Sequence, residues 1–108
     1  MQHNLVRLIG YVGSGLKVKT ISNGSKMAII NVATHDFLRK EGGEKIYSTS
    51  WHQVIAWGGY AEMAELSFIK GSHILVEGSL RYRKYTDDKG EEHRVTEIKA
   101  HSLINLDR

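Results

Sequence analysis

The chain has 108 residues, of which 41% are hydrophobic and 25% charged, as expected for one globular domain with one core. Because it contains no cysteine, it cannot form a disulfide or hold a metal through thiolates, and no apolar run reaches the roughly 18 residues of a membrane span. The net charge of +3 is mildly basic, which is compatible with a polyanionic partner but does not identify one.

The first predicted strand is long and bent. Residues 4–12 alternate with a period of two, so that Arg7 lies on the face opposite Leu8. Gly13-Ser14-Gly15 then interrupts the pattern, which predicts a bulge or a sharp bend. Alternation resumes over residues 16–21, so the strand continues beyond the bend.

The next two predicted strands follow an Asn-Gly hairpin turn within residues 22–25, where the backbone needs a positive φ. The second strand runs from about Lys26 to Phe37 and the third from about Ile46 to Trp57. Between them, residues 38–45 are polar and contain glycine, so we expect a mobile loop there. Gly58-Gly59 ends the third strand.

A short helix and two further strands complete the chain. Helical residues and spacing cover residues 60–69, and Lys70-Gly71 is a typical helix C-terminus. The fourth strand covers about His73 to Tyr85, residues 87–90 form a turn, and the fifth strand covers about His93 to Leu106.

This order of elements predicts the fold class. Three strands, one short helix and two strands, with a first strand long enough to pair at both ends, are typical of a closed barrel. We therefore predict a mainly β OB-fold, a five-stranded Greek-key barrel with its helix between strands three and four. OB-folds bind single-stranded nucleic acid or oligosaccharide, and the fold alone does not choose between these.

The third strand carries both tryptophans on one face. Because side chains alternate, one set shares a face: Tyr47, Thr49, Trp51, Gln53, Ile55 and Trp57. Ile46, Val54 and Ala56 lie on the other face and are suited to a barrel interior. The tryptophan face then points outward, where it would stack on a flat partner. Periodicity leaves a second interpretation open, in which the tryptophans form the core.

Cations and aromatics also alternate in the fourth strand. Arg81, Arg83 and Tyr85 lie opposite an apolar face that includes Ile74 and Val76. Cations beside an aromatic suit a partner with both phosphates and rings, which is nucleic acid. The alternatives are a solvated strand face and, for Tyr85, packing at the hairpin end.

Signatures of catalysis and metal binding are lacking in the sequence. The 6 histidines show none of the helical spacings of metal ligands. Gly13-Ser14-Gly15-Leu16 lacks the remaining residues of a phosphate loop, and Glu62 and Glu65 have no nucleophile or base beside them. We therefore expect no enzyme activity, no metal and no cofactor.

Three segments contain residue types at the spacing that a known protein family shows: residues 4–13, residues 51–58 and residues 76–85. Lys70-Gly71 and Thr96-Glu97-Ile98 fit the same spacing. Over nearly the whole chain this pattern resembles the bacterial-type single-stranded DNA-binding proteins (SSB). The resemblance implies an OB-fold homotetramer that binds single-stranded DNA without sequence preference and serves in DNA replication, recombination and repair.

The resemblance also implies roles for individual residues. Trp51 falls at a stacking tryptophan, Trp57 at a position that is usually a stacking phenylalanine, and Tyr85 at a stacking aromatic that is often tryptophan. Lys70 and Lys84 match basic positions. Arg7, Lys17 and Lys19 are cations that precede the first acidic residue of the chain, Asp36. Together with them, the predicted DNA-binding residues are Trp51, Trp57, Tyr85, Phe37, Arg7, Lys17, Lys19, Lys70, Arg81, Arg83 and Lys84.

The resemblance also implies an interface role for one histidine and a further stacking position. His52 matches a family histidine linked to subunit assembly, so we expect it at an oligomer interface. The family has another stacking aromatic five residues after the alanine of its Ala-Thr pair, which here is Ala33, and that position holds Leu38. We assign its role to Phe37 and infer a one-residue deletion.

The expected partners are single-stranded DNA and further copies of the chain, without a membrane, in the cytoplasm at the nucleoid. We expect one domain over residues 1–108 and no C-terminal tail in this chain, so replication and repair proteins are partners only where the full protein carries such a tail. The alternatives are a dimeric primosome-type OB-fold protein and an oligomeric scaffold with tryptophans buried between subunits.

Overall fold

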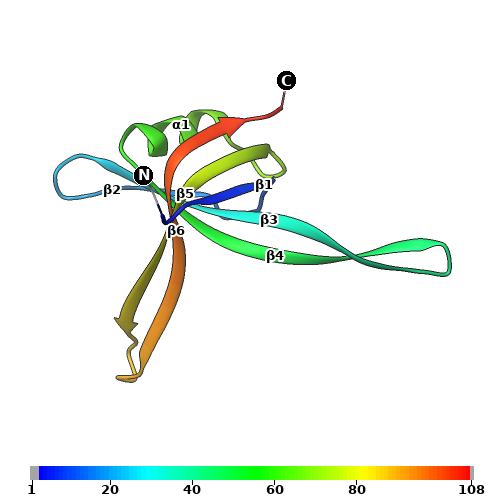
Figure 1. Cartoon of the computed structure of the whole chain (residues 1–108). Coiled ribbons are helices and arrows are strands. Elements are labelled where there is room, and N and C mark those ends of the chain that lie inside the picture. The colour runs from blue at the N-terminus through cyan, green and yellow to red at the C-terminus, as the bar shows by residue number, and fades with distance from the viewer. Residues whose placement is uncertain (1–2, 108) are drawn as a thin grey trace.

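A computed structural model describes residues 3–107 of the chain, and Met1, Gln2 and Arg108, which belong to the predicted domain, lie outside the described residues. Strands make up most of it (Figure 1). The elements in chain order are β1 (Val6–Val12), β2 (Lys17–Thr20), β3 (Lys26–Glu41), β4 (Glu44–Trp57), α1 (Gly59–Ser67), β5 (His73–Thr86) and β6 (Glu92–Asn105).

The strands form one sheet that closes on itself. Their order is β1-β5-β6-β4-β3-β2, and an additional β1–β3 pairing joins the first strand to the other side. The β4–β6 pairing is parallel and places Ile55 beside Lys99. The predicted bent first strand is divided into β1 and β2, and Gly15, with φ 83°, lies in the bend between them.

The prediction of a mobile loop over residues 38–45 is wrong. β3 continues to Glu41 and β4 begins at Glu44, so only Gly42 and Gly43 connect them. Both glycines have positive φ, 56° and 85°, which is the backbone of a tight two-residue hairpin turn. The polar residues around them form cross-strand pairs such as Lys40–Lys45, and their polarity reflects exposure rather than lack of structure.

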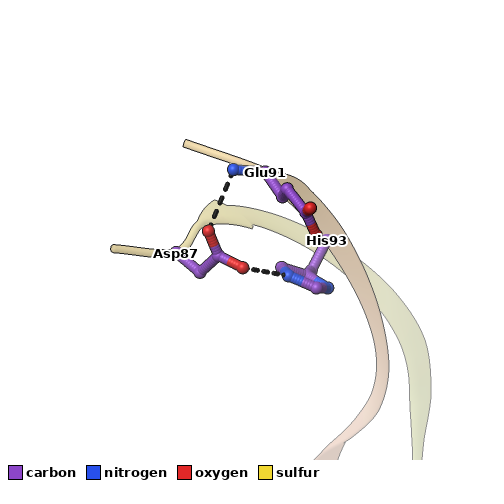
Figure 2. Close-up of side chains that lie close together, drawn as sticks. All are labelled: Asp87, Glu91 and His93. Carbon is purple, nitrogen blue, oxygen red and sulfur yellow. Dashed lines mark hydrogen bonds and ion pairs between the residues drawn. The ribbon is translucent and has the colours of Figure 1, made fainter. Parts of the chain in front are cut away.

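The β5–β6 hairpin closes through the predicted turn. The Asp87 N–H donates to the Glu91 carbonyl at 2.9 Å, and Gly90 has φ 83°. This is a three-residue connection with a left-handed glycine in its last position. The side chains of Asp87, Glu91 and His93 gather at this tip (Figure 2).

Two hairpin ends project from the body of the molecule in different directions (Figure 1). We call them the β3–β4 arm (residues 35–50) and the β5–β6 arm (residues 81–97). The Cα radius of gyration is 15.8 Å, whereas a compact domain of this length would have about 13 Å. The arms account for this difference, because they extend away from the barrel (Figure 1). Their side chains are accordingly mostly exposed.

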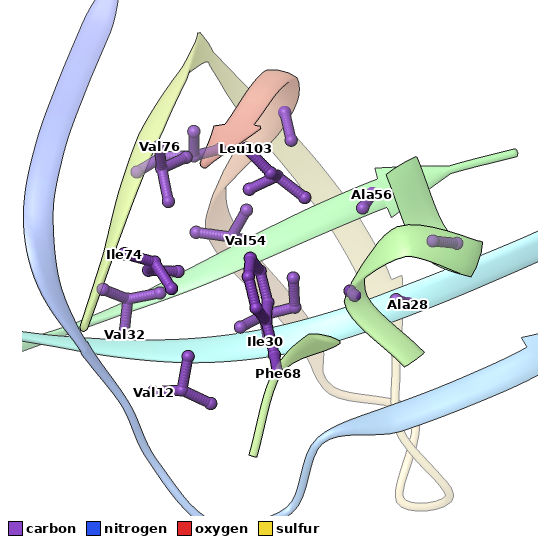
Figure 3. Close-up of a cluster of buried hydrophobic side chains, with 14 residues drawn as sticks. Val12, Ala28, Ile30, Val32, Val54, Ala56, Phe68, Ile74, Val76 and Leu103 are labelled. Atoms are coloured by element: carbon purple, nitrogen blue, oxygen red, sulfur yellow. The ribbon is translucent and has the colours of Figure 1, made fainter. Parts of the chain in front are cut away.

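The hydrophobic core lies inside the closed sheet and under the helix (Figure 3). Its largest fully buried side chains are branched aliphatics: Ile30, Val32, Val54, Ile74 and Val76. Ala61, Ala64 and Phe68 close the core at one end of the barrel. Burying one such aliphatic side chain stabilises the fold by roughly 1.5–3 kcal/mol, so this cluster is the main source of stability.

The helix is short and ends earlier than predicted. Gly58, with φ 57°, redirects the chain after β4, and its N–H donates to the Lys26 carbonyl at 2.8 Å. α1 ends at Ser67 because Phe68 turns to an extended conformation and buries its ring in the core. Within residues 3–107, no helix is both long and apolar enough to cross a membrane.

Candidate nucleic-acid interface

The outward face of β4 carries both tryptophans, as predicted. The exposed fraction is 63% for Trp51 and 41% for Trp57, while Val54 and Ala56 on the opposite face are fully buried. The interpretation of the tryptophans as core residues is therefore wrong for the chain as it stands. Exposure of both rings is unusual for such large apolar groups, and it marks this face as a contact surface.

Trp51 lies against the end of β1. A Cβ atom placed on Gly13 would approach Cζ3 of the Trp51 ring to 2.6 Å, so only glycine leaves room for the ring there. The Gly13 N–H donates to the Asn31 carbonyl at 2.8 Å, which fixes this bend against β3. Ser14 and Asn31 line a hollow with Trp51. The ring is thus held by its edge and remains open to solvent.

Trp57 lies in a groove between the barrel and the β5–β6 arm. The groove has a volume of about 360 Å³ and is lined by apolar, polar and charged side chains from β2 to β6: Lys19, Met27, Ile29, Gln53, Ile55, Trp57, Arg83 and Glu97. An adjoining hollow shares Trp57 and adds Arg81 and Lys99. An indole beside several cations is suited to a base and its phosphates.

Ile55 departs from the outward alternation of β4. Its exposed fraction is only 7%, although it shares a face with the two tryptophans. Lys99 pairs with it from β6, and Ile29 pairs with it from β3. Neighbouring side chains on both sides cover Ile55, so it forms the floor of the groove.

Tyr85 lies near the end of the β5–β6 arm and is 44% exposed. Its ring stacks on that of His93, with centroids 5.1 Å apart and planes at 21°. The Arg83 guanidinium carbon lies 5.8 Å from the ring centroid. Packing at the hairpin end and an exposed aromatic surface are therefore both present at this residue.

Phe37, and not Leu38, shares the face of Trp51. Phe37 pairs with Tyr47, which lies four residues from Trp51 and therefore on the same side of β4. The two rings meet edge to face at 5.9 Å. The register shifts between Phe37 and Arg39, so Leu38 is the extra residue of a bulge.

The predicted phosphate-binding cations divide into two groups. Arg7, Arg83 and Lys84 are paired with Glu77, Glu97 and Glu92 at 2.9, 3.1 and 3.5 Å, respectively. The hydrogen bonds that Arg83 donates to the Glu97 carboxylate raise the pKa of Arg83. Among residues 3–107, the other predicted cations have no carboxylate within ion-pair distance: Lys17, Lys19, Lys70 and Arg81.

Not all of these cations lie at the groove. Lys19, Arg81 and Arg83 line the groove or its adjoining hollow, while Lys17 lies two residues from Lys19 on the same side of β2. Lys70 lies elsewhere, in the turn after α1, where the next residue, Gly71, donates its N–H to the Val12 carbonyl at 2.7 Å. That turn is at the Gly13 end of β1, toward Trp51.

His52 lies on the face of β4 opposite Trp51. It is partly buried, and its Nε2 lies 2.9 Å from Oγ1 of Thr34 on β3. The outward face of β1 presents exposed apolar side chains, including Ile9 and Tyr11, and Leu5, which directly precedes β1, is exposed as well. These residues do not adjoin the groove around Trp57.

The profile of the single-strand binding protein family matches residues 3–106. The chain belongs to this family. Single-stranded DNA-binding protein 1 of Xylella fastidiosa (strain 9a5c) is 38% identical over 104 residues, which make up 95% of this chain and 76% of the relative. Among solved structures, the Plasmodium falciparum SSB complex with ssDNA has a TM-score of 0.87 at 29% identity, over 99% of this chain and 97% of that chain. This structural similarity confirms the predicted OB-fold.

In this member of the single-strand binding protein family, the groove also contains residues that the sequence had not singled out as binding residues. Gln53 lines the groove and belongs to the period-two pattern of the tryptophan face, which could have indicated it. Lys99 had no such signal. It reaches the hollow beside Trp57 only because β6 pairs in parallel with β4.

Proposed function

We propose that this chain binds single-stranded DNA without sequence preference through the outward face of β3, β4 and the β5–β6 arm. One observation carries the proposal: both tryptophans of the chain are exposed on one face, and Lys19, Arg81 and Arg83 line the groove at Trp57 or its adjoining hollow. The membership of the chain in the single-strand binding protein family supports it.

Base stacking supplies the sequence-independent part of the binding. Trp51, Trp57, Tyr85 and Phe37 present exposed ring surface on one face of the sheet. Stacking a base on such a ring stabilises the complex by roughly 1–3 kcal/mol, and every base has a π-face, so no base is preferred. We place the largest contribution at Trp51, whose ring is the more open of the two tryptophans.

Phosphate neutralisation supplies the salt-dependent part. The cations without a carboxylate partner, such as Lys17, Lys19 and Arg81, are available to phosphates without breaking an ion pair. Each phosphate neutralised on a single strand contributes a slope of about −0.7 to the dependence of log K on log salt concentration. Affinity therefore falls as salt rises.

The direct test is a titration with oligo-dT followed by tryptophan fluorescence. We expect quenching that weakens with salt, and a loss of affinity of roughly 1–3 kcal/mol in Trp51→Ala. Tyr60→Ala is the matched control, because Tyr60 is an exposed aromatic on α1 that lines neither the groove nor its adjoining hollow. Unquenched fluorescence with an intact oligomer would rule out the DNA-binding proposal and favour a scaffold.

We further propose a homotetramer with His52 at a subunit seam. The partly buried His52 and the exposed apolar side chains of β1, such as Ile9 and Tyr11, support an oligomer interface separate from the groove. Light scattering should give four times the mass of the chain. A mass of two chains would favour a dimeric primosome-type protein, and a His52→Glu variant should dissociate if the seam is correctly placed.

The cellular role follows from the same proposal. We place the chain at exposed single strands during DNA replication, recombination and repair, in the cytoplasm at the nucleoid. Residues 1–108 would act as one binding unit without catalytic activity. A nuclease and ATPase assay on the purified protein tests the last point. Measurable turnover of DNA or ATP by the protein would contradict it.

A further inference from the structure

The tip of the β5–β6 arm is organised around the carboxylate of Asp87. Its Oδ1 accepts hydrogen bonds from the backbone N–H groups of Lys89 and Glu91, both at 2.9 Å. An aspartate that accepts from the backbone two residues on fixes the turn that follows it. The other oxygen, Oδ2, is therefore held in a defined direction, toward β6 (Figure 2).

That second oxygen orients His93. Nε2 of His93 lies 2.7 Å from Oδ2 of Asp87. The hydrogen bond from His93 and those from the turn lower the pKa of Asp87, so its side chain is an ionised carboxylate near neutral pH. Because a carboxylate can only accept, the proton must be on Nε2 of His93. The contact thus fixes the direction of the imidazole ring.

The imidazole in turn fixes Tyr85. The two residues are directly paired across β5 and β6, and their rings stack at 5.1 Å with planes at 21°. Tyr85 remains 44% exposed. No buried side chain surrounds Tyr85, because its neighbours on β5 are exposed as well. Within the described arm, His93 is the one ring stacked on it.

We propose that His93 is a positioning residue that holds Tyr85 in its base-stacking orientation, with Asp87 orienting His93 from the turn. The inference rests on the proposed function, since it assigns His93 a role in binding single-stranded DNA. His93 acts through Tyr85 and needs no contact with DNA. Without it, the Tyr85 ring regains rotamers that must be lost again when a base stacks.

The expected effect follows from the cost of ordering one side chain on binding. Immobilising a side chain in a complex weakens affinity by about two- to tenfold. His93→Ala should therefore weaken oligo-dT binding by about two- to tenfold when Tyr85 is present. In a Tyr85→Ala background, the same change should have no effect, because there is no ring left to position.

The test is a double-mutant cycle on the full chain. Affinity for oligo-dT is measured for the unmodified protein, Tyr85→Ala, His93→Ala and the double variant, with thermal unfolding as the check on folding. His101→Ala in both backgrounds is the matched control. His101 lies on the same strand as His93, but its Nε2 is hydrogen-bonded to Oγ of Ser79 at 3.1 Å. Its effect should be the same with and without Tyr85.

Two further readouts separate positioning from direct contact. His93→Phe keeps a flat ring opposite Tyr85 and should retain most of the affinity that His93→Ala loses. The salt slope should be unchanged in His93→Ala, whereas loss of a phosphate contact would reduce it by about 0.7. A reduced slope, or an effect of His93→Ala that persists in the Tyr85→Ala background, overturns the inference.

The outcomes also distinguish the inference from the proposed function. If the unmodified protein does not bind oligo-dT, the proposed function fails and the inference fails with it. If Trp51→Ala weakens binding but Tyr85→Ala does not, the proposed function stands and the role of His93 is overturned. Coupling between His93 and Tyr85, with rescue by phenylalanine, supports the inference.

Discussion

The two halves of strand β5 differ in what stabilises them. From His73 to Gly78, every second residue is buried in the barrel, whereas all residues from Arg81 to Thr86 are exposed. The first half is held by core packing, and the second half only by its pairing with β6. The barrel therefore determines the stability of the fold, while the arm presents side chains for binding at little cost to that stability.

From this comparison we expect the largest loss of stability when a cavity is created in the barrel core. Ile30 is fully buried, so Ile30→Ala should lower the free energy of unfolding by about 2–5 kcal/mol. The control is Ile69→Ala, which removes the same atoms from a side chain that is 74% exposed. Urea denaturation at a fixed protein concentration measures both. Similar losses in the two variants would contradict the assignment of the core.

We expect the next largest loss of stability where an added side-chain atom would clash with the backbone inside the barrel. A Cβ atom on Gly10 would clash with the carbonyl oxygen of Ala33 on the neighbouring strand, so Gly10→Ala should cost about 1–3 kcal/mol. Gly59→Ala is the matched control, because no atom lies within 4 Å of its Cβ position and Gly59 begins α1. The control should be neutral or stabilising by up to about 1 kcal/mol. Thermal unfolding distinguishes the two.

An arm residue should affect binding more than stability. Glu97 pairs with the half-exposed Arg83 at 3.1 Å within the groove, and glutamine keeps the shape of Glu97 and can still accept a hydrogen bond, so Glu97→Gln should lower the free energy of unfolding by about 1 kcal/mol. It should strengthen binding to oligo-dT, because it removes a negative charge from the path of the phosphates and frees Arg83. Isothermal titration at two salt concentrations measures the gain.

The control for this prediction is Glu65→Gln, which breaks the Glu65–Lys26 ion pair at 2.7 Å on the helix side of the molecule. Both variants change the net charge equally, but only Glu97 lines the groove. Equal gains in affinity would mean that net charge rather than the local position of the carboxylate controls binding.

The smallest effect is local and depends on pH. The hydrogen bonds from His93 and from the turn lower the pKa of Asp87 below its ordinary value of 3.8. Their contribution is therefore fully present above that value and is lost as the pH falls through the lower pKa of the folded state. The amide NMR signals of Lys89 and Glu91 should shift in this acidic range. Shifts that begin near neutral pH would contradict the assignment.

Much of the fold could be predicted because strand alternation is a local property. The faces of β1 and β4, the bend at Gly13–Gly15 and the turn at residues 87–90 all follow from neighbouring residues. The β3–β4 connection could not, since polar residues with two glycines fit both a mobile loop and a paired hairpin. Cross-strand pairing over residues 39–46 decided it.

The sequence by itself determined that Trp51 and Trp57 share one face of a strand, the order of elements and the family pattern. Only the tertiary structure decided that Ile55 forms a buried floor, that Lys99 joins the groove, and that His93 stacks on Tyr85 beneath Asp87. The physical reason is range. Alternation acts between adjacent residues, whereas these contacts depend on how strands pair and on the exact shape of a turn.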